Sequence, residues 1–124
     1  MLTPKDIVCF IINALDNKKA HSIKLLKTRD VTILADYFVI CTANSSTQLK
    51  TIADEVEKVL KEKGETPLRR EGDRRCGWML IDFGCVIVHL FLKEEREYYT
   101  LERLWADAED VDINDMITVR DTAI

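Results

Sequence analysis

Long apolar segments are missing from this chain, although apolar residues make up 47% of its 124 residues. The longest such segments, among them Cys85 to Phe91, fall far short of the ~20 residues that a membrane-spanning helix needs. The first residues, Met1 to Asp6, also lack the basic and apolar pattern of a leader peptide. The length suits one domain with one core. With charged residues at 32%, we expect a globular protein of the cytoplasm with no membrane contact.

Closely spaced metal or disulfide ligands are missing too. The cysteines are scattered, show no Cys-x-x-Cys spacing and lie within or beside apolar segments. Disulfide frameworks are typical of small secreted chains, and zinc sites need closely paired ligands. With His21 and His89 as the only histidines, we expect no metal site. The residues that we interpret as reduced core cysteines are Cys9, Cys41, Cys76 and Cys85.

Excess positive charge is absent from the body of the chain. The net charge is −4, and residues 107–124 hold six acids and one base, which leaves the rest close to neutral. A nearly neutral body does not indicate general nucleic-acid binding, which requires a strongly basic face. We therefore predict a domain at residues 1–106 and an acidic C-terminal tail at residues 107–124. The tail is expected to lie outside the packed domain unless its apolar residues dock there: Val111, Ile113, Met116, Ile117 and Val119.

Three helices are predicted from apolar residues at helical spacing. The first begins at a hydroxyl N-cap followed by proline, Thr3-Pro4, and ends near Asn17. The second begins with a capping box, in which Ser45 and Gln48 satisfy each other's backbone donors, and it stops at Gly64. The last is expected from about residue 94 to residue 105.

Five segments are predicted as strands, and the one at 36–42 is apolar enough to be central and covered on both faces. Residues 69–75 are predicted as a polar loop, and Asp82-Phe83-Gly84 as a hairpin turn. The resulting order α-β-β-α-β-β-β-α indicates a mixed α/β (α+β) fold, with helices packed on a mixed sheet. The expected strands are His21–Thr28, Asp36–Thr42, Thr66–Arg70, Trp78–Asp82 and Cys85–Phe91.

Aromatic residues gather between Gly77 and Trp105, a stretch with two Trp, two Tyr and His89. Trp and Tyr rings fill cores, but they also dominate binding sites because one ring buries much area at little entropic cost. This profile indicates a recognition surface more than a catalytic pocket. Core packing of the last helix remains the alternative for its aromatic stripe. For His89, a partner contact and a core position are equally open.

Arginines gather between residues 69 and 75, with Glu71 and Asp73 among them. Such a run is usually a solvated surface. The alternative is contact with RNA phosphates, provided that the protein works on an RNA-rich partner. The residues of this possible RNA contact are Arg69, Arg70, Arg74 and Arg75.

Several segments, in order and with compatible spacing from about residue 3 to residue 106, resemble the ribosomal silencing factor family, also called Iojap. They include Asp36-Tyr-Phe-Val-Ile-Cys-Thr, Asn44-Ser-Ser and Glu71-Gly. They continue with Trp78-x-x-x-Asp-x-Gly-x-Val-x-Val-His-x-Phe91 and with Arg96-x-Tyr-Tyr-x-Leu-Glu-x-x-Trp105.

The resemblance implies binding to the large ribosomal subunit through ribosomal protein L-fourteen. Members of the family thereby block subunit joining and repress translation when nutrients are scarce, and organelle relatives act in large-subunit assembly. The family fold is similar to nucleotidyltransferases, which would need a Gly-Ser loop and carboxylates that hold Mg²⁺. Here Asn44-Ser45-Ser46 has no adjacent glycine, and the one Asp-x-Asp, Asp110 to Asp112, lies in the tail. We therefore expect no enzyme and no cofactor.

The hairpin and the last helix are expected to form the partner site. Aromatic residues would supply apolar anchors, and charged residues would pair with groups of the ribosomal protein or nearby rRNA. Three alternatives stay open: an assembly factor that uses the same contact, a nucleotidyltransferase with an unrecognised site, and a homodimer when the protein is free. The partner-site residues are Trp78, Asp82, His89, Arg96, Tyr98, Tyr99 and Glu102.

Overall fold

The computed structural model describes residues 2–28, 35–73, 75, 77–93, 109–111 and 113. Its first seven elements follow the predicted order, and the mixed α/β fold is confirmed. The last predicted helix, at 94–105, lies outside the described residues. The elements are α1 (Pro4–Asn17), β1 (His21–Lys27), β2 (Tyr37–Ala43), α2 (Ser46–Glu62), β3 (Arg69–Asp73), β4 (Trp78–Asp82), β5 (Val86–Leu92) and β6 (Glu109–Val111).

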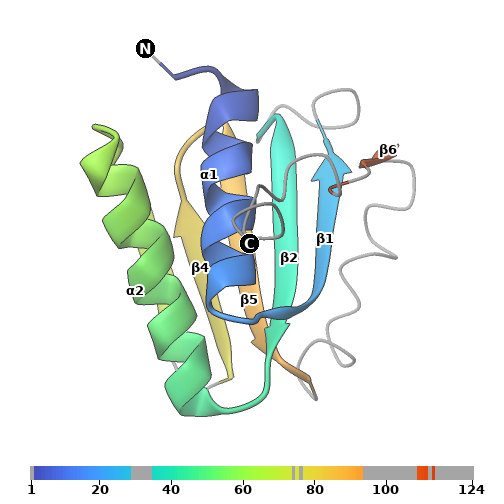
Figure 1. Cartoon of the computed structure of the whole chain (residues 1–124), viewed down its shortest axis with the longest axis vertical. Coiled ribbons are helices and arrows are strands. Elements are labelled where there is room, and N and C mark those ends of the chain that lie inside the picture. The colour runs from blue at the N-terminus through green and yellow to red at the C-terminus, as the bar shows by residue number, and fades with distance from the viewer. Residues whose placement is uncertain are drawn as a thin grey trace, which may run out of the picture.

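The strands form one mixed sheet in the order β3-β4-β5-β2-β1-β6. Figure 1 labels the strands from β4 to β6. Strands β2 and β5 are parallel and lie at the centre, while the other neighbouring strands pair antiparallel. The parallel pair is possible because a long connection, α2 with β3 and β4, separates the two strands in the sequence. Every residue of β2 after Tyr37 is buried, which confirms the predicted central strand.

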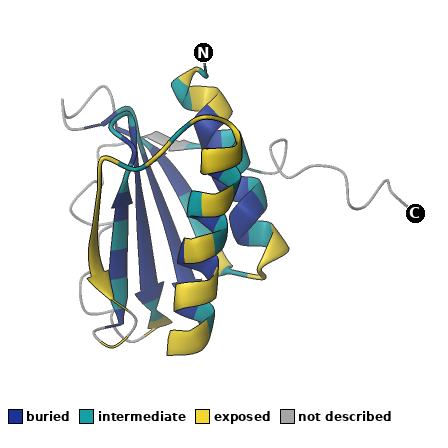
Figure 2. Ribbon diagram, turned by 90° about the vertical axis from the view of Figure 1, so that its left-hand side faces the viewer, coloured by how far each residue is buried: buried dark blue, intermediate teal, exposed yellow. Residues whose placement is uncertain are grey.

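Both described helices pack on the same face of the sheet (Figures 1 and 2). Helix α1 begins with a complete capping box between Thr3 and Asp6. Helix α2 departs from the prediction. The Ser45 hydroxyl accepts from the Gln48 N–H, but the Gln48 side chain accepts from the Asn44 N–H and donates to carbonyls near the end of α1. Gln48 therefore ties α2 to the segment after α1 instead of closing a capping box.

The core has two parts because β2 and β5 are apolar on both faces. The larger cluster fills the space between the helices and the sheet. The smaller cluster lies on the opposite face, which we call the second face. Its members, buried or half-buried, are Leu26, Ala35, Phe38, Ile40, Trp78, Leu80, Ile87 and Phe91.

The structure corrects the predicted edge strand and loop. Residues 69–73, predicted mostly as loop, form strand β3, whereas residues 66–68 are not part of a strand. All five residues of β3 are exposed, and the strand is visible along one edge of the sheet in Figure 2. Gly72 makes this pairing possible, because a β-carbon there would lie 2.2 Å from the Trp78 carbonyl oxygen.

The acidic tail contributes to the sheet, as the alternative in the prediction allowed. Residues 109–111 form β6, which pairs with β1 at the edge opposite β3. Val111 and Ile113 pack against the larger core cluster. The expectation that the tail lies outside the packed domain is therefore wrong for these residues. The described helices include none that is long and apolar enough to cross a membrane.

Candidate partner-binding face

Six of the eleven predicted site residues lie in the described part of the chain. Trp78, Asp82 and His89 belong to the β4–β5 hairpin. The described arginines are Arg69 and Arg70 on β3 and Arg75 after it. The predictions that fall outside the described residues concern Arg74, Arg96, Tyr98, Tyr99 and Glu102.

Strand pairing builds rows of side chains on the second face. In the middle row, Glu71 of β3 pairs with Leu80 of β4, Leu80 with His89 of β5, and His89 with Ile40 of β2. Paired residues on neighbouring strands point to the same face, so these side chains lie side by side. The two flanking rows join Asp73 with Trp78 and Phe91, and Arg69 with Asp82 and Ile87.

Trp78 and Leu80 form the apolar part of this face next to the charged edge. Both side chains are half-buried and pack against the smaller core cluster. The alternate residues of β4, Met79 and Ile81, are buried in the larger cluster under the helices. Sequence reasoning missed Leu80. Its period-two spacing with Trp78 and Asp82 was the signal that places it on the same face.

His89 is a buried histidine without the hydrogen bond that such a ring usually makes. It is 7% exposed, and within the described part of the chain neither ring nitrogen has a hydrogen-bond partner. Its ring centre lies 5.1 Å from that of Phe38 and 6.2 Å from that of Phe91. Burial lowers the pKa of His89 to about 4, because the charged imidazolium loses its hydration there. The ring is therefore neutral at pH 7.

Asp82 is engaged within the chain. One carboxylate oxygen accepts the Gly84 N–H at 2.7 Å, and the other accepts from Arg69 Nε at 3.2 Å. The side chain is only 15% exposed. The Phe83 N–H donates to the Val86 carbonyl, which closes the hairpin at the predicted turn. Asp82 thus links the hairpin turn, through Gly84, to strand β3, through Arg69.

Each described arginine of the 69–75 segment also has an acidic partner. Arg69 pairs with Glu71 as well as with Asp82. Arg75 pairs with Asp73 at 3.5 Å. In this part of the chain the arginines do not form a separate cationic patch, so contact with RNA phosphates would require them to share or leave these acids.

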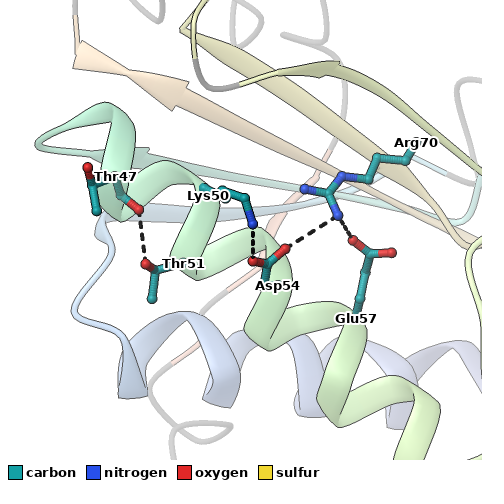
Figure 3. A network of polar contacts seen from close by, with 6 residues as sticks. All are labelled: Thr47, Lys50, Thr51, Asp54, Glu57 and Arg70. Carbon is teal, nitrogen blue, oxygen red and sulfur yellow. Dashed lines mark hydrogen bonds and ion pairs between the residues drawn. The ribbon is translucent and has the colours of Figure 1, made fainter.

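Arg70 points the other way, toward α2. Its guanidinium contacts Glu57 and lies 3.5 Å from Asp54, which also accepts from Lys50 (Figure 3). This network fastens the edge strand to the helix layer. Among the described residues, no three His, Cys, Asp or Glu side chains are grouped so that they could hold a metal ion.

Comparison with known proteins places this geometry in a family. The family described as "Ribosomal silencing factor during starvation" matches residues 2–123. The chain is 40% identical over 117 residues to "Ribosomal silencing factor RsfS" of Halalkalibacterium halodurans, which covers 94% of this chain and 100% of that protein. It is 31% identical to mouse "Mitochondrial assembly of ribosomal large subunit protein 1", over 77% of this chain and 43% of that protein.

A solved structure agrees with the fold. The crystal structure of a protein from Chromobacterium violaceum superposes with a TM-score of 0.82 at 34% sequence identity. The match covers 85% of this chain and 88% of the other. The described fold is therefore also found in a solved structure.

Proposed function

Because this chain belongs to the ribosomal silencing factor family, we propose that it binds the large ribosomal subunit through ribosomal protein L-fourteen and blocks subunit joining. Translation would fall as a consequence when nutrients are limited. The names of its relatives, a silencing factor and a factor for assembly of the large ribosomal subunit, support the large subunit as the target.

One observation carries the proposal in the structure. Trp78 and Leu80 lie side by side on the second face, half-buried in the free chain and next to the charged strand β3. Large apolar side chains surrounded by polar residues are the usual composition of a protein-binding site. Docking would complete the burial of both side chains.

The mechanism is steric and requires no catalytic group. A protein seated on the joining face of the large subunit occupies space that the small subunit needs. Apolar anchors such as Trp78 would set the dissociation rate, because their burial is lost only when the complex separates. Charged residues at the rim would mainly set the association rate and its dependence on salt. We propose no cofactor for this function.

The test is co-sedimentation of the purified full chain with isolated large and small subunits at two salt concentrations. We expect the chain to sediment with the large subunit alone. When both subunits are then mixed, the fraction of joined ribosomes should fall as the chain is added. Binding to neither subunit would refute the proposal. Binding to the large subunit with normal joining would refute the block while leaving the contact intact.

An assembly role is the second candidate, and the name of the mouse relative favours it. It uses the same contact at an earlier time. Cells without the protein would then accumulate unfinished large subunits under rapid growth, whereas a silencing factor would be needed mainly during starvation. Gradient profiles of such cells in both conditions distinguish the two roles.

A further inference from the structure

We infer that Glu71 receives a lysine or arginine side chain of the protein that docks on the second face. This inference rests on the proposed function and adds a specificity residue to it. Glu71 belongs to the segment whose arginines were predicted as solvated surface, with contact to RNA phosphates as the alternative. In the structure, the β3 residue that pairs in register with the apolar Leu80 is an acid, Glu71, and not an arginine.

The alternation of β3 decides which side chains face the partner. Arg70 pairs in register with Ile81 of the larger core and reaches the acids of α2. Glu71, the next residue, pairs in register with Leu80 and lies on the second face. Its neighbours on that face are Arg69 and Asp73, two residues away on either side.

Among the described residues of β3 and β4, the charge on the second face is negative on balance. Arg69 is the one base on this face of β3, and it is shared between Asp82 and Glu71, at 3.2 Å from each. Asp82 is nearly covered, but the Glu71 side chain is 46% exposed. Within the described residues, Arg69 is the ion partner of Glu71. A carboxylate offers about four acceptor positions, so Glu71 has room for a second cation.

His89 is a second polar side chain in this row. It lies in the same row as Glu71, with Leu80 between them, and its buried ring nitrogens lack partners among the described residues. Neighbouring strands lie about 4.8 Å apart, so Glu71 and His89 are separated by roughly 10 Å along the row. A buried polar group without a partner is costly.

The chemistry of the row favours a cationic protein surface over RNA. Phosphates brought to Leu80 would meet the carboxylates of Glu71 and Asp73, while Arg69, the base on this face of β3, is already paired with acids. A lysine or arginine would instead extend the ion-pair chain from Asp82 through Arg69 to Glu71. Docking would also exclude water from these pairs, which strengthens them.

The experiment compares Glu71→Gln with a matched control. Glu71→Gln removes the charge and keeps the shape of the side chain. Glu62→Gln makes the same change at an exposed position of α2, on the other side of the sheet. The association rate and affinity of each full chain for isolated large subunits are measured at low and high salt. We expect Glu71→Gln to weaken binding about three- to ten-fold at low salt and less at high salt, with Glu62→Gln unchanged.

The sign of the effect separates the possible occupants. Tighter binding by Glu71→Gln would overturn the inference in favour of RNA phosphate, because a repulsive charge would have been removed. Equal affinity of Glu71→Gln and the unaltered chain at both salt concentrations would overturn it as well. Glu71→Lys, at the same exposed position, should weaken binding further than Glu71→Gln. If the unaltered chain binds no subunit, the proposed function itself fails, which is a different result from either of these.

Discussion

Gly72 and Trp78 approach so closely that a β-carbon on Gly72 would stand 2.2 Å from the Trp78 carbonyl oxygen. The two strands β3 and β4 pair across this contact, with Gly72 opposite Met79 and Asp73 opposite Trp78. Gly72 also has φ +76, a conformation that residues with side chains rarely adopt. The edge strand that carries Glu71 therefore depends on a glycine.

Gly72→Ala should destabilise the fold by at least about 2 kcal/mol, because strain at positive φ and a backbone clash act together. Gly64→Ala is the matched control, since Gly64 has φ +87 but nothing lies within 4 Å of an added β-carbon. That control should lose only about 1 kcal/mol. Urea unfolding of the three proteins measures both effects. Equal losses for the two variants would show that the contact with Trp78 is not strained.

A polar clamp between β3 and α2 gives a second prediction. The Arg70 side chain contacts Glu57 and Asp54 and is 32% exposed (Figure 3). The Arg75 side chain is 88% exposed. Arg70→Gln should therefore cost about 1 kcal/mol and increase amide exchange in β3, because a network of partly shielded charges is lost. Arg75→Gln should change neither the free energy of unfolding nor the amide exchange in β3. The prediction fails if exchange in β3 is the same in both variants.

The fold was predictable where the signals are local. The N-cap at Thr3, the apolar stripe of each helix and the apolar segment of β2 all act within a few residues. Strand β3 was not predictable, because its five residues are exposed and carry no apolar alternation; pairing with β4 makes it a strand. Gln48 departed from the expected cap for a similar reason, since its partners lie about 30 residues away.

The candidate site shows the same division between local and distant information. Trp78 and His89 were predicted as site residues from residue type. Leu80 shares a face with Trp78 by simple alternation along β4. The row that joins Leu80 to Glu71 and His89 depends on the register of three strands, which no spacing within one segment determines.

His89 predicts a pH dependence of stability. Its pKa is lowered from 6.5 to about 4 in the folded chain, so the folded state binds fewer protons than the unfolded state between those values. The contribution of His89 to the free energy of unfolding is complete above pH 6.5 and is lost as the pH falls toward 4. The loss amounts to about 3 kcal/mol, since each pKa unit corresponds to about 1.4 kcal/mol.

The measurement for His89 is the free energy of unfolding from pH 8 to pH 4, for the unaltered chain and for His89→Leu. Leucine suits the apolar surroundings of Phe38 and Phe91 and carries no titratable group. The difference between the two proteins should change in favour of the variant as the pH falls below 6.5. A constant difference across this range would contradict the buried, neutral histidine.

The apolar anchors give the prediction that bears most directly on function. Trp78→Ala and Leu80→Ala should each weaken binding to isolated large subunits, and Trp78→Ala by at least about 2 kcal/mol, or about thirty-fold in Kd, if it is a true anchor. The control is Phe10→Ala, a half-buried ring on α1 that lies 4.9 Å from Lys63 Nζ and packs against the larger core. Truncation of this ring also costs stability, but it leaves the second face unchanged.

Stability and affinity must be measured on the same preparations, because Trp78 also packs against the smaller core cluster. A protein that is folded by circular dichroism, yet binds about thirty-fold more weakly, has lost a contact and not its fold. If Phe10→Ala weakens binding as much as Trp78→Ala does, the loss reflects general destabilisation and the second face is not the docking surface. If Trp78→Ala binds with unchanged affinity while folded, Trp78 serves the core alone. Only selective loss in the Trp78 and Leu80 variants locates the partner on β4.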